Sequence, residues 1–237
     1  MLTANSKVTS KTDFLEGQIL LFNKPLGWTS FDLVKKVRGI IKSAKQIKKI
    51  KVGHAGTLDP LAGGLLIICT GKFTKKIQEI QKEKKVYTGE ITLGATTPSY
   101  DMETKTNQTF DVSGVTNDLI YETAKKFEGK IMQKPPIFSA LKLGGRRLYK
   151  YARAGNNIEI KSREVEIEKF KILSINMPKI TFKVVCSKGT YIRSLAHDFG
   201  RKLNSGAYLS GLRREQIGNF KLSESLSLDS FKESVLI

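Results

Sequence analysis

The chain contains 237 residues, and its 41 Lys and Arg against 22 Asp and Glu give a formal net charge of +19 at pH 7. Such an excess of positive charge favours polyanionic partners, with nucleic acid ahead of an anionic membrane surface. No apolar run approaches the roughly 18 residues of a membrane-spanning helix, and the N-terminus lacks the apolar segment of a signal peptide. The sequence therefore predicts a cytoplasmic, nucleic-acid-binding protein without membrane contact.

The cysteines and histidines are too few and too scattered for a usual metal site. Cys69 and Cys186 each lie in an apolar or strand-like segment, which predicts buried free thiols rather than a disulfide. Together with His54 and His197 they match no usual zinc-ligand spacing. We expect neither a metal nor another cofactor, and we interpret His197 as a structural histidine.

The first elements of the chain are a tail, a strand and a helix. Residues 1–16 are polar and lack periodicity, which predicts a loose tail. A strand over 18–22 and a turn follow. Thr29 or Ser30 can then cap a helix, because apolar residues after them fall on one helical face: Leu33, Val34, Val37, Ile40 and Ile41.

The other face of this helix and the residues after it are basic. From Lys35 to Lys51 there are eight Lys or Arg residues and no acid. A charge run is usually a solvated face, but eight unbalanced cations repel one another unless an anion lies nearby. We therefore favour a phosphate-binding surface.

The stretch from Gly53 to Gly71, GHAGTLDPLAGGLLIICTG, carries the candidate catalytic group. Pro60 restricts Asp59 to an extended conformation, and the glycines allow the backbone to approach a ligand closely. The short apolar run over 65–69 predicts a strand buried on both faces, which would anchor the loop. A carboxylate held in this way can act as a nucleophile, a general base or a metal ligand, whereas the plainer alternative is an Asx-Pro turn.

The middle of the chain predicts alternating helices and strands. The expected elements are a helix over 74–81, a strand over 86–93 that carries Tyr87, a long loop over 94–114, a helix over 117–127, a strand over 135–142 and a basic helix with tyrosines over 146–153. Cations among aromatic rings suit RNA, because bases stack on rings while cations meet phosphates.

The last third of the chain adds strands over 164–175, 180–186 and 207–212, and an amphipathic segment over 228–236. Thr190 can cap a helix that has Arg193 in its first turn. The helix dipole disfavours a cation there, so we expect a specific anionic partner for Arg193 and nominate Asp59. The mixture of elements predicts an α+β or mixed-sheet single domain.

Several of these motifs, in this order from about residue 18 to 220, resemble the bacterial TruB-type tRNA pseudouridine-55 synthases. The motifs are Asn23-Lys24-Pro25 with Gly27 and Ser30, GHAGTLDPLAGG at 53–64, Tyr87 on its strand, Ser139-Ala140-Leu141-Lys142, and CSKGTYIR at 186–193. The resemblance implies the pseudouridine synthase fold, with a mainly antiparallel curved sheet, flanking helices and a central RNA-binding cleft. It also implies the reaction, in which a T-loop uridine of tRNA is detached at N1, turned and rejoined through C5.

The resemblance also implies roles for individual residues. Asp59 matches the catalytic aspartate, Tyr87 the tyrosine that packs on the target base, and Arg193 the arginine that pairs with the aspartate. His54 matches the histidine that fills the gap left in the loop stack after base flipping. Further substrate-binding positions are Lys24, Tyr191 and Leu212. Whether the carboxylate attacks ribose C1′ or uracil C6, or deprotonates the sugar, stays open.

The chain departs from the family pattern at two places. Only about seventeen residues follow Phe220, too few for the C-terminal PUA domain of longer members, so we expect residues 17–237 to form the catalytic domain alone. Pro98 stands where the family commonly has an acidic residue. The implied partner is the T arm of tRNA, and no protein partner is implied.

Two other classes of function compete with this hypothesis. A non-catalytic RNA-binding protein or RNA chaperone would satisfy the net charge alone. A phosphate-transferring or hydrolytic enzyme that uses Asp59 is less favoured, because the sequence has no Walker-type loop and no second clustered carboxylate.

Overall fold

A computed structural model of the chain describes residues 12–156 and 158–236. The chain divides into two compact units: the first ends at Tyr87 and resumes at Arg213, and the second is Thr88–Leu212. Two strands, β4 (Lys85–Leu93) and β12 (Ala207–Ile217), run from one unit into the other along the chain. In the part that the structure describes, no helix is long and apolar enough to cross a membrane.

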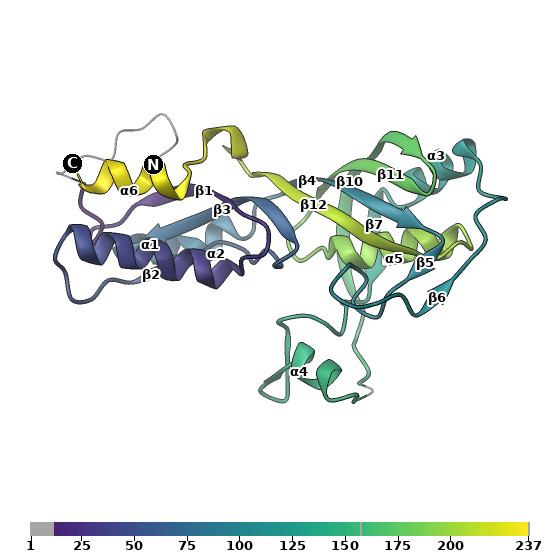
Figure 1. Ribbon diagram of the computed structural model, residues 1–237, viewed down its shortest axis with the longest axis horizontal. Helices are drawn as coiled ribbons and strands as arrows, with labels where there is room; N and C mark the ends of the chain where they lie inside the picture. Colours follow the sequence, from purple (N-terminus) through teal and green to yellow (C-terminus); the bar gives the residue numbers. More distant parts are fainter. Residues whose placement is uncertain (1–11, 157, 237) are drawn as a thin grey trace. The chain divides into compact units, whose positions relative to one another are not determined.

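In the first unit, α1 and α6 pack against the strands β1 and β3 (Figure 1). In the strand order β1–β3–β12, β1 runs antiparallel to β3, from Ile19 opposite Cys69 to Lys24 opposite Gly64. The elements of this unit are β1 (Ile19–Lys24), α1 (Ser30–Ala44), β2 (Val52–His54), β3 (Ala62–Thr70), η1 (Gly71–Lys76), α2 (Ile77–Ile80), β13 (Phe220–Lys221), η2 (Leu222–Glu224) and α6 (Leu228–Leu236).

Two sequence predictions in this unit are confirmed. All nine residues of β3 are buried, so the run predicted over 65–69 is a buried strand that extends at both ends. Thr29 caps α1: its Oγ1 accepts a hydrogen bond from Asp32 N at 3.1 Å, and Asp32 Oδ2 accepts one from Thr29 N at 2.9 Å. This reciprocal pair satisfies two amides that the first turn of a helix leaves open.

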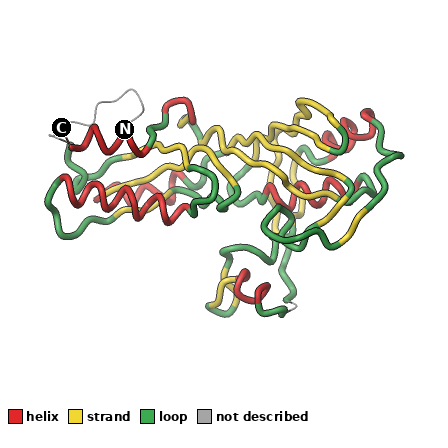
Figure 2. Tube along the Cα trace, in the orientation of Figure 1, coloured by secondary structure: helices red, strands yellow, loops and turns green. Residues whose placement is uncertain are grey.

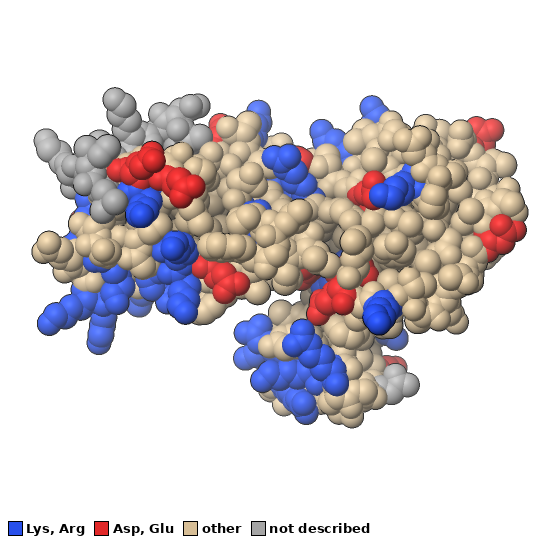
Figure 3. All heavy atoms as spheres, in the orientation of Figure 1, with Lys and Arg blue, Asp and Glu red and all other residues tan. Residues whose placement is uncertain are grey.

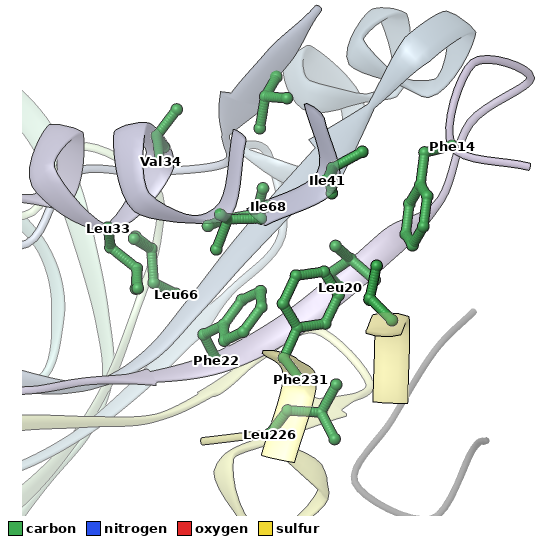
Figure 4. Close-up of a cluster of buried hydrophobic side chains, with 13 residues drawn as sticks. Phe14, Leu20, Phe22, Leu33, Val34, Ile41, Leu66, Ile68, Leu226 and Phe231 are labelled. Carbon is green, nitrogen blue, oxygen red and sulfur yellow. The ribbon is translucent and has the colours of Figure 1, made fainter. Parts of the chain in front are cut away.

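A core of apolar side chains joins α1 and α6 to β1 and β3 (Figure 4). Phe231 of α6 is fully buried, and its ring lies edge-on to Phe22 at 5.3 Å and to Phe14 at 6.2 Å. The tail predicted over 1–16 falls mostly on residues 1–11, which lie outside the described part. Of its remaining residues, Phe14 is buried in this core.

The second unit has the strand order β12–β4–β11–β10–β7, with β10 antiparallel to both neighbours. Its aromatic core includes Phe170, which lies edge-on to Phe182 at 5.6 Å and to Phe199 at 5.5 Å. Besides β4 and β12 the elements are β5 (Ala95–Thr96), β6 (Gln108–Thr109), α3 (Asn117–Lys126), β7 (Gly129–Gln133), β8 (Lys142–Leu143), β9 (Arg146–Arg147), α4 (Leu148–Arg153), β10 (Arg163–Asn176), β11 (Lys179–Cys186) and α5 (Ile192–Lys202).

The structure corrects several predicted elements. The strand predicted over 135–142 is wrong: β7 ends before the prolines, and the segment around α4 is mostly loop (Figure 2). Proline has no amide to donate to a strand ladder, so two in succession end the pairing. The loop predicted over 94–114 holds the β5–β6 pair.

Further corrections concern the ends of two late elements. α5 begins after Tyr191, and Thr190 does not cap it, because its Oγ1 donates to Ser187 O at 3.0 Å instead. β12 continues past Leu212 to Ile217. The mixed sheet with flanking helices confirms the predicted α+β class.

The core of the first unit gives a stability prediction. We expect Phe231→Ala to lower the free energy of unfolding by about 3–5 kcal/mol, because it removes a fully buried ring and leaves a cavity. Phe31→Ala is the matched control, since Phe31 is 61% exposed and its loss should change stability by less than about 1 kcal/mol. Urea denaturation measures both values, and equal losses would contradict this account of the core.

Candidate active site

Asp59 lies on the loop that joins β2 to β3, residues 55–61, here called the Asp59 loop. Its side chain is half-buried. The backbone of the loop turns back at its end, where Ala62 N donates to Asp59 O at 3.0 Å and Gly27 N donates to Pro60 O at 2.8 Å. Three buried side chains, Lys24, Ser30 and Arg214, hold the rest of the main chain of this loop.

Arg214 makes the most contacts to this backbone. The residue is only 1% exposed, although it lies in β12 beside the exposed Arg213. Its Nε donates to Leu65 O at 2.8 Å, and its two terminal nitrogens donate to Gly56 O at 2.9 Å and to Thr57 O at 3.4 Å. The planar, permanently charged guanidinium thus ties the loop and β3 to β12.

Gly64 allows this close approach. Its φ is +99°, and a Cβ at this position would lie 2.4 Å from Arg214 O. Any side chain would therefore meet the backbone of β12 and strain its own φ. The glycine predicted to let the backbone approach a ligand is here required by protein packing.

Lys24 holds the other end of the loop from inside the protein. It is 1% exposed, and its Nζ donates to Trp28 O at 2.6 Å, to Pro25 O at 2.8 Å and to Pro60 O at 3.5 Å. Burial lowers the pKa of Lys24 to about 8, although the nearby Asp59 carboxylate acts in the opposite direction. The Lys24 ammonium thus interacts electrostatically with the Asp59 carboxylate. Its hydrogen bonds go to main-chain oxygens, one of them in the Asp59 loop.

Ser30, at the start of α1, fixes the centre of the loop. Its Oγ donates to Leu58 O at 3.0 Å and accepts from Leu58 N at 2.8 Å, so one hydroxyl satisfies both backbone groups of that residue. Leu58 is itself buried. The backbone on the N-terminal side of Asp59 is therefore as constrained as the backbone at Pro60.

His54 and Tyr87 also belong to the first unit. His54 lies in β2, and burial and then the charge of Arg214 lower the pKa of its imidazole, so the ring is neutral at pH 7. Tyr87 lies in β4 and is 9% exposed. Neither ring carries a positive charge for a phosphate, and both are aromatic. The two rings therefore suit stacking against a base better than contact with a phosphate.

Arg193 lies in the second unit and is 4% exposed. Its Nε forms an ion pair with Asp101 Oδ2 at 3.6 Å, and its NH1 donates to Ser99 O at 3.2 Å. No sequence pattern marked Asp101, because it lies among the polar residues of the segment predicted as a long loop over 94–114. The pairing of Arg193 with Asp59 of the first unit stays a prediction.

The other predicted binding residues of the second unit lie at the start of α5 and at the end of the unit. Gln133 fixes the main chain of Tyr191: its Oε1 accepts from Tyr191 N at 2.8 Å, and its Nε2 donates to Tyr191 O at 3.1 Å. The Arg163 guanidinium lies 4.9 Å from the centre of the Tyr191 ring. Leu212, the last residue of the unit, is half-buried.

His197 fits its structural interpretation. Its ring stacks on Tyr100 with 3.9 Å between the ring centres, and burial, followed by the charge of Arg201, lowers its pKa to about 4. Across residues 12–156 and 158–236, no group of three or more His, Cys, Asp or Glu side chains is arranged to hold a metal ion.

Comparison with known proteins places this site in context. The family model described as TruB family pseudouridylate synthase (N terminal domain) matches residues 42–192. The tRNA pseudouridine synthase B of Flavobacterium johnsoniae is 55% identical over 224 residues, which cover 94% of this chain and 98% of that protein. The protein of the same name from Phocaeicola vulgatus is 50% identical and covers 93% of this chain and 94% of its own length.

Solved structures show the same similarity at a lower level. A chain of the structure described as a Cbf5-Nop10-Gar1 complex is 27% identical, with a TM-score of 0.72 over 98% of this chain and 58% of its own length. A chain of an H/ACA ribonucleoprotein bound to a substrate RNA containing 2′-deoxyuridine is 26% identical, with a TM-score of 0.67 over 93% of this chain and 53% of its own length.

The anchoring role of Arg214 can be tested against its neighbour in β12. We expect Arg214→Ala to lower the free energy of unfolding by about 3 kcal/mol or more, because three carbonyls lose their donor. Arg213→Ala should cost less than about 1 kcal/mol, since Arg213 is exposed and its ion pair with Glu215 is solvated. If urea denaturation gave similar losses for the two variants, Arg214 would not be an anchor.

Proposed function

Since the chain belongs to the TruB family of pseudouridylate synthases and isomerises uridine to pseudouridine in tRNA, we propose that its target is uridine 55 of the T loop and that Asp59 is the catalytic carboxylate. The chain has the pseudouridine synthase fold. The observation that carries the proposal is the anchoring of the Asp59 loop by Lys24, Ser30 and Arg214. We also propose a cytoplasmic location, where tRNA is available.

The isomerisation breaks the bond between N1 and ribose C1′ and forms a bond between C5 and C1′, while the C5 proton is exchanged for one on N1. Uridine and pseudouridine are isomers, so the reaction needs no oxidant or reductant. A carboxylate held in a fixed position can serve as its reactive group. The carboxylate must be ionised to attack C1′ or C6 or to remove a sugar proton. The nearby Lys24 ammonium favours that ionised form.

The remaining residues take roles in exposing the target base. Flipping a base out of its stack costs a few kcal/mol, which contacts with protein side chains must offset. We assign His54 to the gap in the loop stack, Tyr87 to stacking on the flipped uracil, and Tyr191 and Leu212 to further contacts with the substrate. The neutral state of His54 supports its part, because an uncharged aromatic ring can replace a base in a stack.

The first test replaces the proposed catalytic group. Asp59→Asn should abolish pseudouridine formation while tRNA binding stays within about threefold of wild type, because the amide has nearly the same shape but cannot act as nucleophile or base. Asp118→Asn, an exposed aspartate of α3, is the control for the same chemical change. Carbodiimide-primer extension on full-length tRNA reports both the amount and the position of the product.

Two outcomes of that experiment would overturn separate parts of the proposal. Turnover by Asp59→Asn within about tenfold of wild type would remove Asp59 from the chemistry. A wild-type product at a nucleotide other than position 55 would refute the T-loop assignment and leave the catalytic assignment open.

The second test concerns the proposed pairing of Arg193 with Asp59 during catalysis. Arg193→Gln should raise the pKa that sets the acidic limb of the kcat/KM profile, because the carboxylate loses a cation in a site with little water. Arg193→Lys keeps the charge, so it should lower the rate while leaving the acidic limb closer to its wild-type position. Profiles with an unchanged acidic limb for both variants would exclude the pairing.

A further inference from the structure

A hollow of about 850 Å³ in the first unit is lined by seven cations and no carboxylate. We call it the basic groove; its cations include Lys48, Lys49 and Lys51 of the loop between α1 and β2, Arg38 of α1 and Lys72 of η1. Figure 3 shows Lys and Arg side chains crowding the part of the surface where α1 and this loop lie. Three separate segments of the chain thus contribute like charge to one concave surface.

Such an arrangement is unfavourable for the protein alone. Like charges within one concave surface repel each other, and the low-dielectric wall strengthens the field inside it. Lys72 Nζ forms an ion pair with Glu16 Oε1 at 2.7 Å beside the groove, and both side chains of this pair are exposed. The charge of the groove is therefore balanced by solution ions or by a bound polyanion, whose binding would release those ions.

Arg38 supplies the groove with a cation that is held in place. Its NH2 donates to Val52 O at 3.0 Å, which fixes the guanidinium against β2, while the residue also lines the groove. Phosphate oxygens are good acceptors for a guanidinium.

The groove lies far from Asp59 along the same strand. Gly71 of the groove follows the last residue of β3, whereas the Asp59 loop leads into its first residue. Nine residues at about 3.3 Å each place these two ends roughly 30 Å apart. This distance equals roughly nine base pairs of B-form DNA at about 3.4 Å each, and an A-form RNA duplex, which rises less per base pair, needs more than that to span it.

We propose that the basic groove binds backbone phosphates of tRNA outside the T arm, while the T loop lies at Asp59. This inference rests on the proposed function, because it takes the T-loop uridine as the nucleotide at the catalytic carboxylate. A hairpin whose paired stem is shorter than about nine base pairs cannot span the separation along its axis, so we expect whole tRNA to fill the groove and such a T-arm hairpin to leave it empty.

The test compares two triple variants that remove the same charge. The groove variant is Lys48→Gln, Lys49→Gln, Lys51→Gln, and the control variant is Lys169→Gln, Lys171→Gln, Lys183→Gln, which changes exposed lysines of β10 and β11. Binding of full-length tRNA and of a T-arm hairpin transcript is measured from about 50 to 300 mM salt, over which the Debye length falls from roughly 14 to roughly 6 Å. Urea denaturation checks that both variants keep wild-type stability.

We expect the groove variant to bind tRNA roughly 10- to 100-fold more weakly than wild type at physiological salt. The slope of log affinity against log salt should become shallower by about two units, since each lost phosphate contact removes about 0.7 to 0.9. KM for tRNA should rise far more than kcat falls. The preference for tRNA over the hairpin should shrink about tenfold or more, whereas the control variant should keep the wild-type slope and preference.

Three results would overturn the proposal: an unchanged salt slope in the groove variant, an equal loss in the control variant, or an equal loss of hairpin binding, which would place the groove on the T arm. The binding measurements and the position of the product can be told apart. An unchanged salt slope in the groove variant would refute the phosphate contacts of the groove and leave the T-loop assignment intact. A wild-type product at another nucleotide would refute the T-loop assignment, and with it the placing of the groove outside the T arm.

Discussion

Two buried cations hold the main chain around Asp59, and the rest of the candidate site depends on them. A buried charge is costly unless its hydrogen bonds are made, and Lys24 and Arg214 make theirs to carbonyl oxygens on both sides of the carboxylate. The same two charges set the local electrostatics, because Lys24 lies close to Asp59 and Arg214 helps to keep His54 neutral. The two cations thus act both on the position of the loop and, together with burial, on the protonation of the groups around it.

The sequence predicted those parts of the site that are encoded by local patterns. The apolar run before Cys69 predicted the buried β3, Thr29 predicted the start of α1, and the Asp-Pro step predicted a constrained Asp59. Each of these depends on the chemistry of near neighbours in the chain. The resemblance to known synthases then supplied the activity, which no pattern of propensity or charge could have given.

What the sequence could not predict are contacts between residues distant along the chain. Arg214 looks like one of a pair of surface cations, and only the pairing of β12 beside β3 shows that it is the buried one. Asp101 looks like a polar loop residue until α5 brings Arg193 against it. The resemblance implied a substrate-binding position for Lys24, which stays a prediction, and nothing in the local sequence indicated that this lysine is buried.

Anchoring through carbonyls has a consequence for how freely this loop can vary. Lys24 and Arg214 hold only main-chain oxygens, and Ser30 holds both backbone groups of Leu58, so none of these bonds depends on which side chains the loop carries. Thr57 and Leu61 project from this fixed frame into solvent. Evolution or design can therefore exchange the side chains at 57 and 61 without removing the hydrogen bonds that hold the main chain around Asp59.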